Sequence, residues 1–181
     1  RDSKSLVASV GKLGRRLIRL SVATGEKEPL ILPRLEEAAL DPAIGDLLPA
    51  VSPDGLRLAF VRQIATVSAD IYVAPLGNGQ PQRLTRGAEA LGVTWTPDGR
   101  ELVDGGGGFL SRQGGGGMAL WRRSVEAPVT SPSTRIQSIE PGAFQPVISY
   151  SASSSSARLA YTRFVVDTNI WVTKVNPQAQ P

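Results

Sequence analysis

The sequence contains no cysteine and no histidine among its 181 residues. Without cysteine the chain forms no disulfide bond and offers no thiolate to a metal. The absence of cysteine does not indicate whether the protein works in a reducing or an oxidising compartment. Without histidine it lacks the usual acid–base group near neutral pH and the commonest metal ligand. Ser-His-Asp and Cys-His catalysis are therefore excluded for this chain alone. We expect it not to be an enzyme and to need no cofactor, with catalysis by carboxylates alone as the remaining alternative.

Long apolar runs are also missing, and none approaches the roughly 18–20 residues that a membrane-spanning helix needs. We therefore expect no membrane partner. Glycine (19 residues) and proline (14 residues) are abundant, which is typical of short strands joined by many turns. Hydrophobic residues make up 41% of the chain and charged residues 20%, as in ordinary globular proteins.

A short phrase occurs nearly twice, 44 residues apart. Residues 51–58 read VSPDGLRL, and residues 95–102 read WTPDGREL. In each copy an apolar run stops at a Pro-Asp-Gly turn and restarts after it. These turns consist of Pro53, Asp54, Gly55, Pro97, Asp98 and Gly99. A third copy is distorted, with a serine tract at 153–156 in place of the turn.

Self-similarity at a period of about 40–45 residues, with four short strands per unit, is the signature of a β-propeller blade. The sequence therefore predicts an all-β fold, a β-propeller of four-stranded antiparallel blades with about four blades present. We expect one domain over residues 1–175 and a frayed tail at 176–181. The predicted blades span residues 1–45 (incomplete), 46–87, 88–139 and 140–175. Because the first segment is incomplete and closure of four blades is uncommon, we expect an open arc; a closed four-bladed ring is the alternative. The chain starts without methionine, so we expect it to be either processed or an excised piece.

The strands are predicted most clearly in the second blade, residues 46–87. We expect an inner strand at 48–52, a nearly all-apolar strand at 58–61 that is buried on both faces, a third strand at 70–74 and an outer strand at 82–85. The third strands carry an aromatic residue at one equivalent position, namely Tyr72, Trp121 and Trp171. We expect these rings to pack between blades; a stacking platform for bases or ligands is the alternative.

Two further features have a structural and a functional interpretation. The tetraglycine runs at 105–108 and 114–117 predict a long flexible loop, rather than a phosphate cradle, because no Gly-Lys-Ser/Thr ending follows them. A basic cluster consists of Lys12, Arg15, Arg16 and Arg19. A solvated strand edge is the favoured interpretation of this cluster, and a phosphate-binding surface is the alternative.

Several motifs resemble those of a known family. They are SPDGLRLAF (52–60), DIYV (70–73), RLT (83–85), PDGRE (97–101), LWR (120–122), RLAYTR (158–163) and NIW (169–171). They are similar to the repeat of the TolB-like β-propellers, and closest to the propeller half of bacterial regulators that join such a propeller to a winged-helix DNA-binding domain. The resemblance covers most of residues 46–175 and implies that the chain is a fragment of a six-bladed propeller. It departs from the family pattern in the glycine-rich and serine-rich tracts.

From this resemblance we expect a non-catalytic scaffold for protein–protein or ligand interaction, the sensing part of a cytoplasmic transcriptional regulator. Such a chain would reach DNA only through a fused winged-helix domain. One alternative is the gating propeller of a prolyl-oligopeptidase-type serine peptidase whose catalytic domain is absent here. Another is a periplasmic TolB-like protein. Direct binding of nucleic acid, motivated by the net charge of +4, is a further alternative.

The candidate interaction surface is a rim of loops at one end of the blades. It comprises residues 63–69, 86–91, 104–117, 140–145 and 164–168. Within it, Glu89, Arg112 and Asp167 are the charged residues predicted to contact a partner. No metal site is predicted, because Asp54 and Asp98 stand in turns where aspartate ordinarily bonds to its own backbone.

Overall fold

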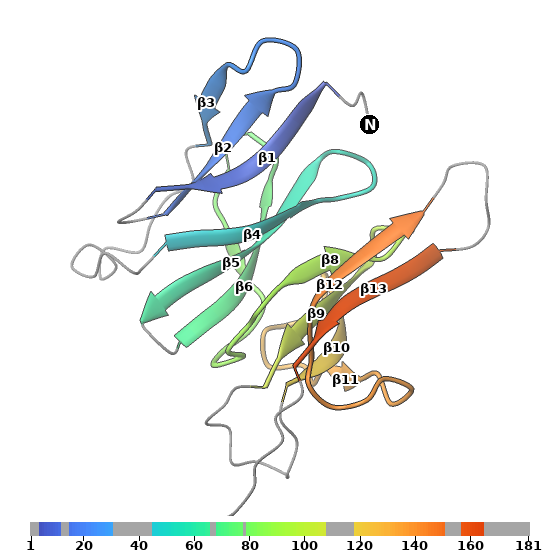
Figure 1. The fold of residues 1–181 in the computed structure, drawn as a ribbon. Coiled ribbons are helices and arrows are strands. Elements are labelled where there is room, and N and C mark those ends of the chain that lie inside the picture. The colour runs from blue at the N-terminus through green and yellow to red at the C-terminus, as the bar shows by residue number, and fades with distance from the viewer. Residues whose placement is uncertain are drawn as a thin grey trace, which may run out of the picture.

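The computed structural model describes residues 4–11, 15–30, 45–65, 68–77, 79–107, 118–150 and 157–164. Within these ranges the chain forms thirteen strands in four antiparallel sheets and contains no helix. Strands that follow one another in sequence are neighbours in each sheet, so every sheet is a simple meander. Figure 1 shows the sheets fanned out one after another.

The strand bounds follow the repeat. Sheet A consists of β1 (Ser5–Val10), β2 (Arg16–Ser21) and β3 (Lys27–Pro29). Sheet B consists of β4 (Gly45–Val51), β5 (Arg57–Ala65), β6 (Ser68–Pro75) and β7 (Gln82–Arg83). Sheet C consists of β8 (Val93–Trp95), β9 (Glu101–Gly106), β10 (Ala119–Ser124) and β11 (Thr134–Arg135). Sheet D is described over β12 (Ala143–Tyr150) and β13 (Ala157–Arg163).

The first strands of successive sheets contact one another, β1 against β4, β4 against β8 and β8 against β12. Small antiparallel meanders that meet along their first strands are the arrangement of propeller blades. The predicted fold class, an all-β partial propeller, is therefore confirmed. The predicted tail at 176–181 and the strand around Trp171 lie outside the described residues.

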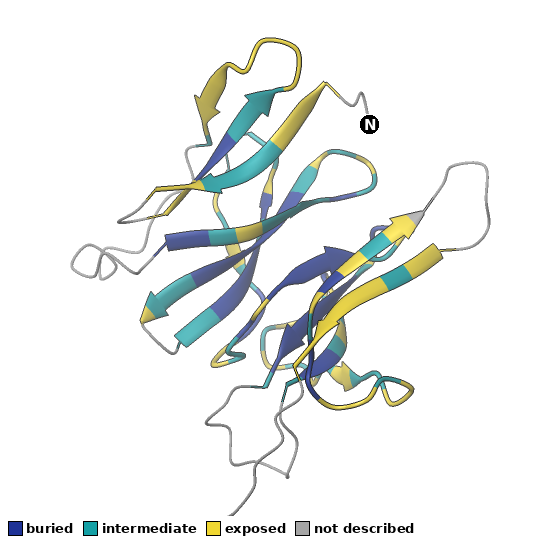
Figure 2. Cartoon of the chain, viewed as in Figure 1, coloured by how far each residue is buried: buried dark blue, intermediate teal, exposed yellow. Residues whose placement is uncertain are grey.

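The core lies between the sheets. Alternate residues of β5 point to opposite faces, so Leu58 and Phe60 join a cluster with Leu17 of sheet A. Ala59 and Val61 instead join a second cluster that includes residues of sheet C. All four β5 residues are almost fully buried, as predicted for this strand. Figure 2 shows sheets B and C mostly dark blue, with more yellow on sheets A and D.

The aromatic residues of the third strands differ in environment. Tyr72 is buried between sheets A and B, where its ring stacks on Phe60 with centroids 5.9 Å apart. The predicted packing between blades is confirmed for this ring. Trp121 is only half-buried, and its Nε1 donates a hydrogen bond to the carbonyl oxygen of Gly106 at 3.2 Å. It lines a pocket between sheets B and C and is not packed away as Tyr72 is.

The first Pro-Asp-Gly turn is held by a compact set of hydrogen bonds. Ser52 Oγ donates to Asp54 Oδ1 at 2.5 Å and accepts from the backbone N–H of Arg57 at 2.8 Å. Asp54 Oδ1 also accepts from the N–H of Leu56 at 3.0 Å. Gly55 adopts a positive φ of 75°, which favours glycine. The residue before the proline is therefore as much part of the motif as the turn itself.

The second turn repeats these bonds. Thr96 Oγ1 donates to Asp98 Oδ1 at 2.6 Å and accepts from the N–H of Glu101 at 3.1 Å. Asp98 Oδ1 accepts from the N–H of Arg100 at 3.1 Å, and Gly99 has a φ of 69°. Both aspartates thus bond within their own turns, which is the structural role that the sequence indicates.

The first tetraglycine run departs from the predicted loop. Gly105 and Gly106 are buried residues of β9. A Cβ on Gly105 would lie 2.7 Å from the Cα of Phe144 in sheet D, and one on Gly106 would lie 2.7 Å from the carbonyl oxygen of Ala88. The prediction of a flexible loop is wrong for these two residues, because glycine there allows neighbouring backbones to approach closely. Residues 108–117 lie outside the described residues.

After β3, the N–H of Leu30 continues the pairing by bonding to the carbonyl oxygen of Leu17. One smaller prediction also changes. The outer strand β7 covers Gln82–Arg83 rather than 82–85, because Thr85 turns inward to bond with β6.

Candidate functional site

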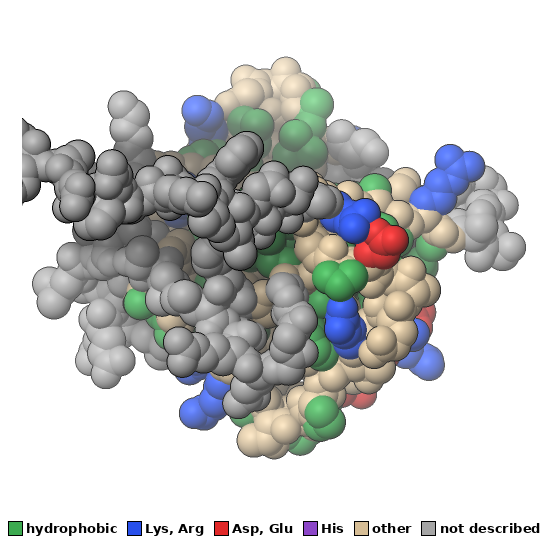
Figure 3. Space-filling view, turned by 60° about the horizontal axis from the view of Figure 1, so that its bottom comes forward, with side chains coloured by type: hydrophobic (Ala, Val, Ile, Leu, Met, Phe, Trp, Pro, Cys, Tyr) green, Lys and Arg blue, Asp and Glu red, His purple; other side chains and the backbone are tan. Residues whose placement is uncertain are grey.

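The predicted rim loops come together at one end of the sheets. The N–H of Ala90 bonds to the carbonyl oxygen of Ala69, and that of Gly107 bonds to the carbonyl oxygen of Ala88. Between sheets C and D, the N–H of Gly142 bonds to the carbonyl oxygen of Met118. The N–H of Phe164 bonds in turn to the carbonyl oxygen of Gly142. Backbone from sheets B, C and D is therefore hydrogen-bonded into one surface. Figure 3 views the molecule with this end turned forward.

One of the three predicted rim charges is described. Glu89 is half-buried in the connection between β7 and β8, with a positive φ of 45°. Non-glycine residues seldom adopt this conformation, and it occurs often where function constrains the backbone. Arg112 and Asp167 lie outside the described residues, so their place on the rim stays a prediction.

A fully buried aspartate anchors this connection. Asp70 in β6 accepts hydrogen bonds from Thr85 Oγ1 at 2.8 Å, from the N–H of Ala88 at 3.2 Å and from Arg83 Nη2 at 2.5 Å. The carboxylate therefore ties the start of the connection to the third strand of sheet B. In the sequence, Asp70 is identified only as part of the DIYV motif, and its structural role is not predicted. The pattern that could have indicated this role is an aspartate at the start of an apolar strand, followed by an Arg-Leu-Thr segment.

A second buried pair lies between sheets A and B. Arg62 donates from Nε to Asp46 Oδ1 at 2.7 Å and from Nη2 to Oδ2 at 3.0 Å. Its guanidinium lies over the rings of Phe60 and Tyr72, 5.2 Å and 5.0 Å from their centroids. Ser9 Oγ of sheet A donates to the carbonyl oxygen of Asp46 at 2.8 Å. Both residues of the pair belong to sheet B, and the hydrogen bond from Ser9 joins Asp46 to sheet A.

A third pair joins two strands of sheet C beside a pocket. Arg123 donates from Nε to Asp104 Oδ1 at 2.8 Å and from Nη2 to Oδ2 at 3.3 Å. Burial raises the pKa of Asp104 despite this neighbour. The pocket beside the pair has a volume of about 360 Å³, within the range of ligand sites. Its walls come from sheet C, from the connection after β7 and from residues 129–133.

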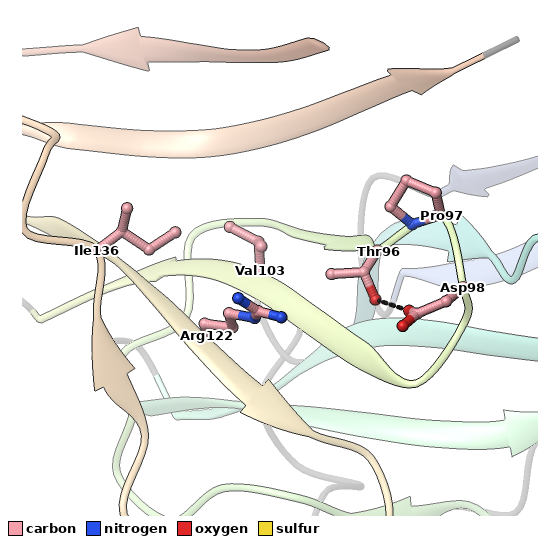
Figure 4. Close-up of a pocket in the computed structure, with 6 residues that line it drawn as sticks. All are labelled: Thr96, Pro97, Asp98, Val103, Arg122 and Ile136. Atoms are coloured by element: carbon pink, nitrogen blue, oxygen red, sulfur yellow. Dashed lines mark hydrogen bonds between the residues drawn. The ribbon is translucent and has the colours of Figure 1, made fainter. Parts of the chain in front are cut away.

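A separate groove of about 440 Å³ lies on the opposite face of sheet C. Its lining residues are Thr96, Pro97, Asp98, Val103, Arg122 and Ile136 (Figure 4). Its charged side chains are already bonded, Asp98 to Thr96 and Arg122 to Glu101. The groove therefore offers mainly apolar contacts and no group poised for chemistry.

Other kinds of site find no support in the part of the chain that the structure describes. No group of three or more potential ligands is placed to hold a metal there. None of its elements is a helix with the length and hydrophobicity to cross a membrane.

No protein-family model and no curated protein matches the sequence. Solved structures do match. TolB from Acinetobacter baumannii is 18% identical, with a TM-score of 0.57 over 90% of this chain and 39% of that one. A prolyl endopeptidase is 16% identical, with a TM-score of 0.59 over 90% of this chain and 25% of that one.

These likenesses define the class of fold. The chain has the fold of a TolB-like β-propeller, a fold shared with the propeller domains of peptidases. It spans less than half the length of either matched protein. The expected link to a transcriptional regulator is not shown by these matches.

Proposed function

We propose that this chain is a non-catalytic part of a β-propeller that binds a protein or ligand on its rim. The observation that carries the proposal is the joining of three sheets at one end. There Asp70 and the backbone bonds of Ala88 and Gly142 hold loops on packed strands. Loops on a rigid scaffold are the usual carriers of binding function in such folds. The lack of histidine and cysteine supports a non-catalytic role.

As the parent protein, we propose a periplasmic TolB-like protein or a peptidase with a gating propeller. The matches to TolB and to a prolyl endopeptidase support these two parents, although fold alone does not determine function. The regulator interpretation, with its cytoplasmic location, rests on sequence motifs only and comes second. The complete gene product separates them: an α/β-hydrolase domain would identify the peptidase, and a winged helix would identify the regulator.

The rim is tested by charge reversal at its described acidic residue. We expect wild-type protein to retain a specific partner from an extract of its source cells, and Glu89→Lys to lose it. Glu126→Lys is the matched control, because Glu126 is exposed beyond the end of β10 that lies away from the rim. A partner that binds both variants equally would contradict the rim. Failure of wild-type protein to retain any partner would contradict the scaffold role.

The absence of catalysis is tested directly. The isolated chain should not hydrolyse a chromogenic prolyl peptide above the rate of buffer. Hydrolysis that purifies with the chain and is lost when a carboxylate is replaced would overturn the non-catalytic proposal.

A further inference from the structure

The repeat allows equivalent positions of sheets B and C to be compared. In the strand ladders Phe60 lies opposite Tyr72, and Asp104 lies opposite Trp121. Each pair faces the preceding sheet. The matched positions are Phe60, Tyr72 and Ala74 in sheet B, and Asp104, Trp121 and Arg123 in sheet C. At these three positions, apolar and aromatic side chains of sheet B are thus replaced by an ion pair and a tryptophan in sheet C; an ion pair of sheet B, Arg62 with Asp46, stands at other positions.

The two positions also differ in how the space is filled. In sheet B, Phe60 and Tyr72 stack and are closed over by Leu17 of sheet A. In sheet C, the pocket of about 360 Å³ stays open beside Trp121. Its polar walls include Arg86, Asp104, Arg123, Ser131 and Ser133. The indole N–H is already bonded to Gly106, so the ring is held as a wall of this pocket.

The ion pair in this place is not explained by stability. Removing a carboxylate and a guanidinium from water costs more than burying apolar groups of similar size. Sheet B shows that the fold accepts apolar groups at the same positions. Departures of this kind from a repeat are expected where a site has another role.

Positive charge exceeds negative charge around the pocket. Asp104 is paired with Arg123, whereas Arg86 stands exposed in the lining. Arg135 lies across the ladder from Trp121 but outside the pocket lining, and its buried Nε has no hydrogen-bond partner. At the matching place in sheet B, Arg83 reaches Asp70, but the residue that corresponds to Asp70 in sheet C is Ala119.

We propose that the pocket beside Trp121 binds a small aromatic carboxylate. The flat ring lies against the indole, and the guanidinium of Arg86 holds the carboxylate, because guanidinium and carboxylate match in charge and geometry. Ser131 and Ser133 line the same space. This site rests on the proposed function and deepens it, because part of the pocket lining belongs to the rim segments 86–91 and 104–117.

The test is calorimetric titration of the whole chain with benzoate, benzylamine and inorganic phosphate. We expect saturable binding of benzoate with a dissociation constant of about 1 mM or lower, and none of benzylamine. Arg86→Gln should weaken benzoate about tenfold, because it removes a charged donor from an exposed position without disturbing the core. Arg100→Gln, the same change at the exposed Pro-Asp-Gly end, should leave the affinity within about twofold.

The proposal would be overturned by no saturation by benzoate at tens of millimolar, by equal binding of benzylamine or by unchanged affinity in Arg86→Gln. Phosphate that binds as tightly as benzoate would also overturn it, because the ring would then contribute nothing. Trp121→Leu provides a second variant, checked for folding by its melting temperature, and it should lose benzoate binding. Because none of these measurements involves Glu89, their failure is distinguishable from failure of the rim.

Discussion

Arg57 of sheet B donates a hydrogen bond from Nη2 to the carbonyl oxygen of Gly99 in sheet C, at 2.7 Å. Its guanidinium also lies over the ring of Trp95, 4.8 Å from the centroid. In return, Trp95 Nε1 donates to the carbonyl oxygen of Ala50 at 2.8 Å. The two Pro-Asp-Gly ends are thus joined directly, at the end of the blades away from the rim.

Replacing Arg57 by methionine should lower the free energy of unfolding by about 1–3 kcal/mol. Methionine keeps the apolar stem but loses the charged hydrogen bond and the cation–π contact. Urea denaturation measures the change. Arg100→Met, at an exposed position in the neighbouring turn, is the control and should stay within about 0.5 kcal/mol of wild type. Equal midpoints for the two variants would show that the link carries no stability.

The hydroxyl before each Pro-Asp-Gly turn should be required, whichever residue supplies it. Ser52→Ala leaves the N–H of Arg57 without its side-chain acceptor and should cost about 1–2 kcal/mol. Thr96→Ser keeps the equivalent bond to Glu101 and should cost clearly less. Thermal melting compares the variants. Similar losses in both would mean that side-chain volume, not hydrogen bonding, matters there.

The turn aspartates predict a dependence of stability on pH. The hydrogen bond from Thr96, followed by that from the N–H of Arg100, lowers the pKa of Asp98. A carboxyl group whose pKa is lower in the folded state stabilises the folded chain above its pKa in the unfolded state, about 4. This stabilisation is lost as the pH falls through the pKa of the folded state. Asp98→Asn should therefore lose less stability than wild type between about pH 4 and pH 2.

Urea midpoints across this range measure the effect, with Glu126→Gln as a control carboxylate. Burial raises the pKa of Asp104, so its contribution to the pH dependence of stability has the opposite sign. Asp104 is present in both wild type and Asp98→Asn, and its contribution is therefore the same in the two proteins. Parallel curves for wild type and Asp98→Asn would contradict the prediction.

Gly105→Ala should destabilise the chain by about 1–3 kcal/mol, because the new Cβ would lie 2.7 Å from the Cα of Phe144. In a flexible loop the same substitution would stabilise slightly, since alanine restricts the unfolded chain. The sign of the change in urea midpoint therefore decides between strand and loop. Gly25→Ala, where nothing lies within 4 Å of the added Cβ, measures the cost of a positive φ without a collision.

The sequence predicted the turns and the fold well because their causes are local. The bonds of Ser52, Asp54 and Gly55 all lie within a few residues, so a short motif is enough to specify them. The alternation of β5 likewise follows from consecutive side chains. The repeat then extends this local pattern to a whole architecture.

The pocket could not be predicted in the same way. Asp104 and Arg123 are separated by two glycine runs, and only the pairing of β9 with β10 brings them together. The pocket beside Trp121 is likewise completed by residues 85–88 from the connection between sheets B and C. The sequence did contain an indication of the pocket, because the repeat places Asp104 at the position that Phe60 has in sheet B. The glycine run that follows Asp104 favoured a loop instead, so this replacement was not recognised as part of a strand.

The amino-acid order alone determined where strands turn and which side chains of each strand enter the core, since period and turn chemistry act over a few neighbours. Tertiary structure alone decided which backbones approach so closely that glycine is required, and which charges are neutralised. Those outcomes depend on contacts between blades distant in sequence, and no local pattern records whether such a contact fills its space or leaves a pocket.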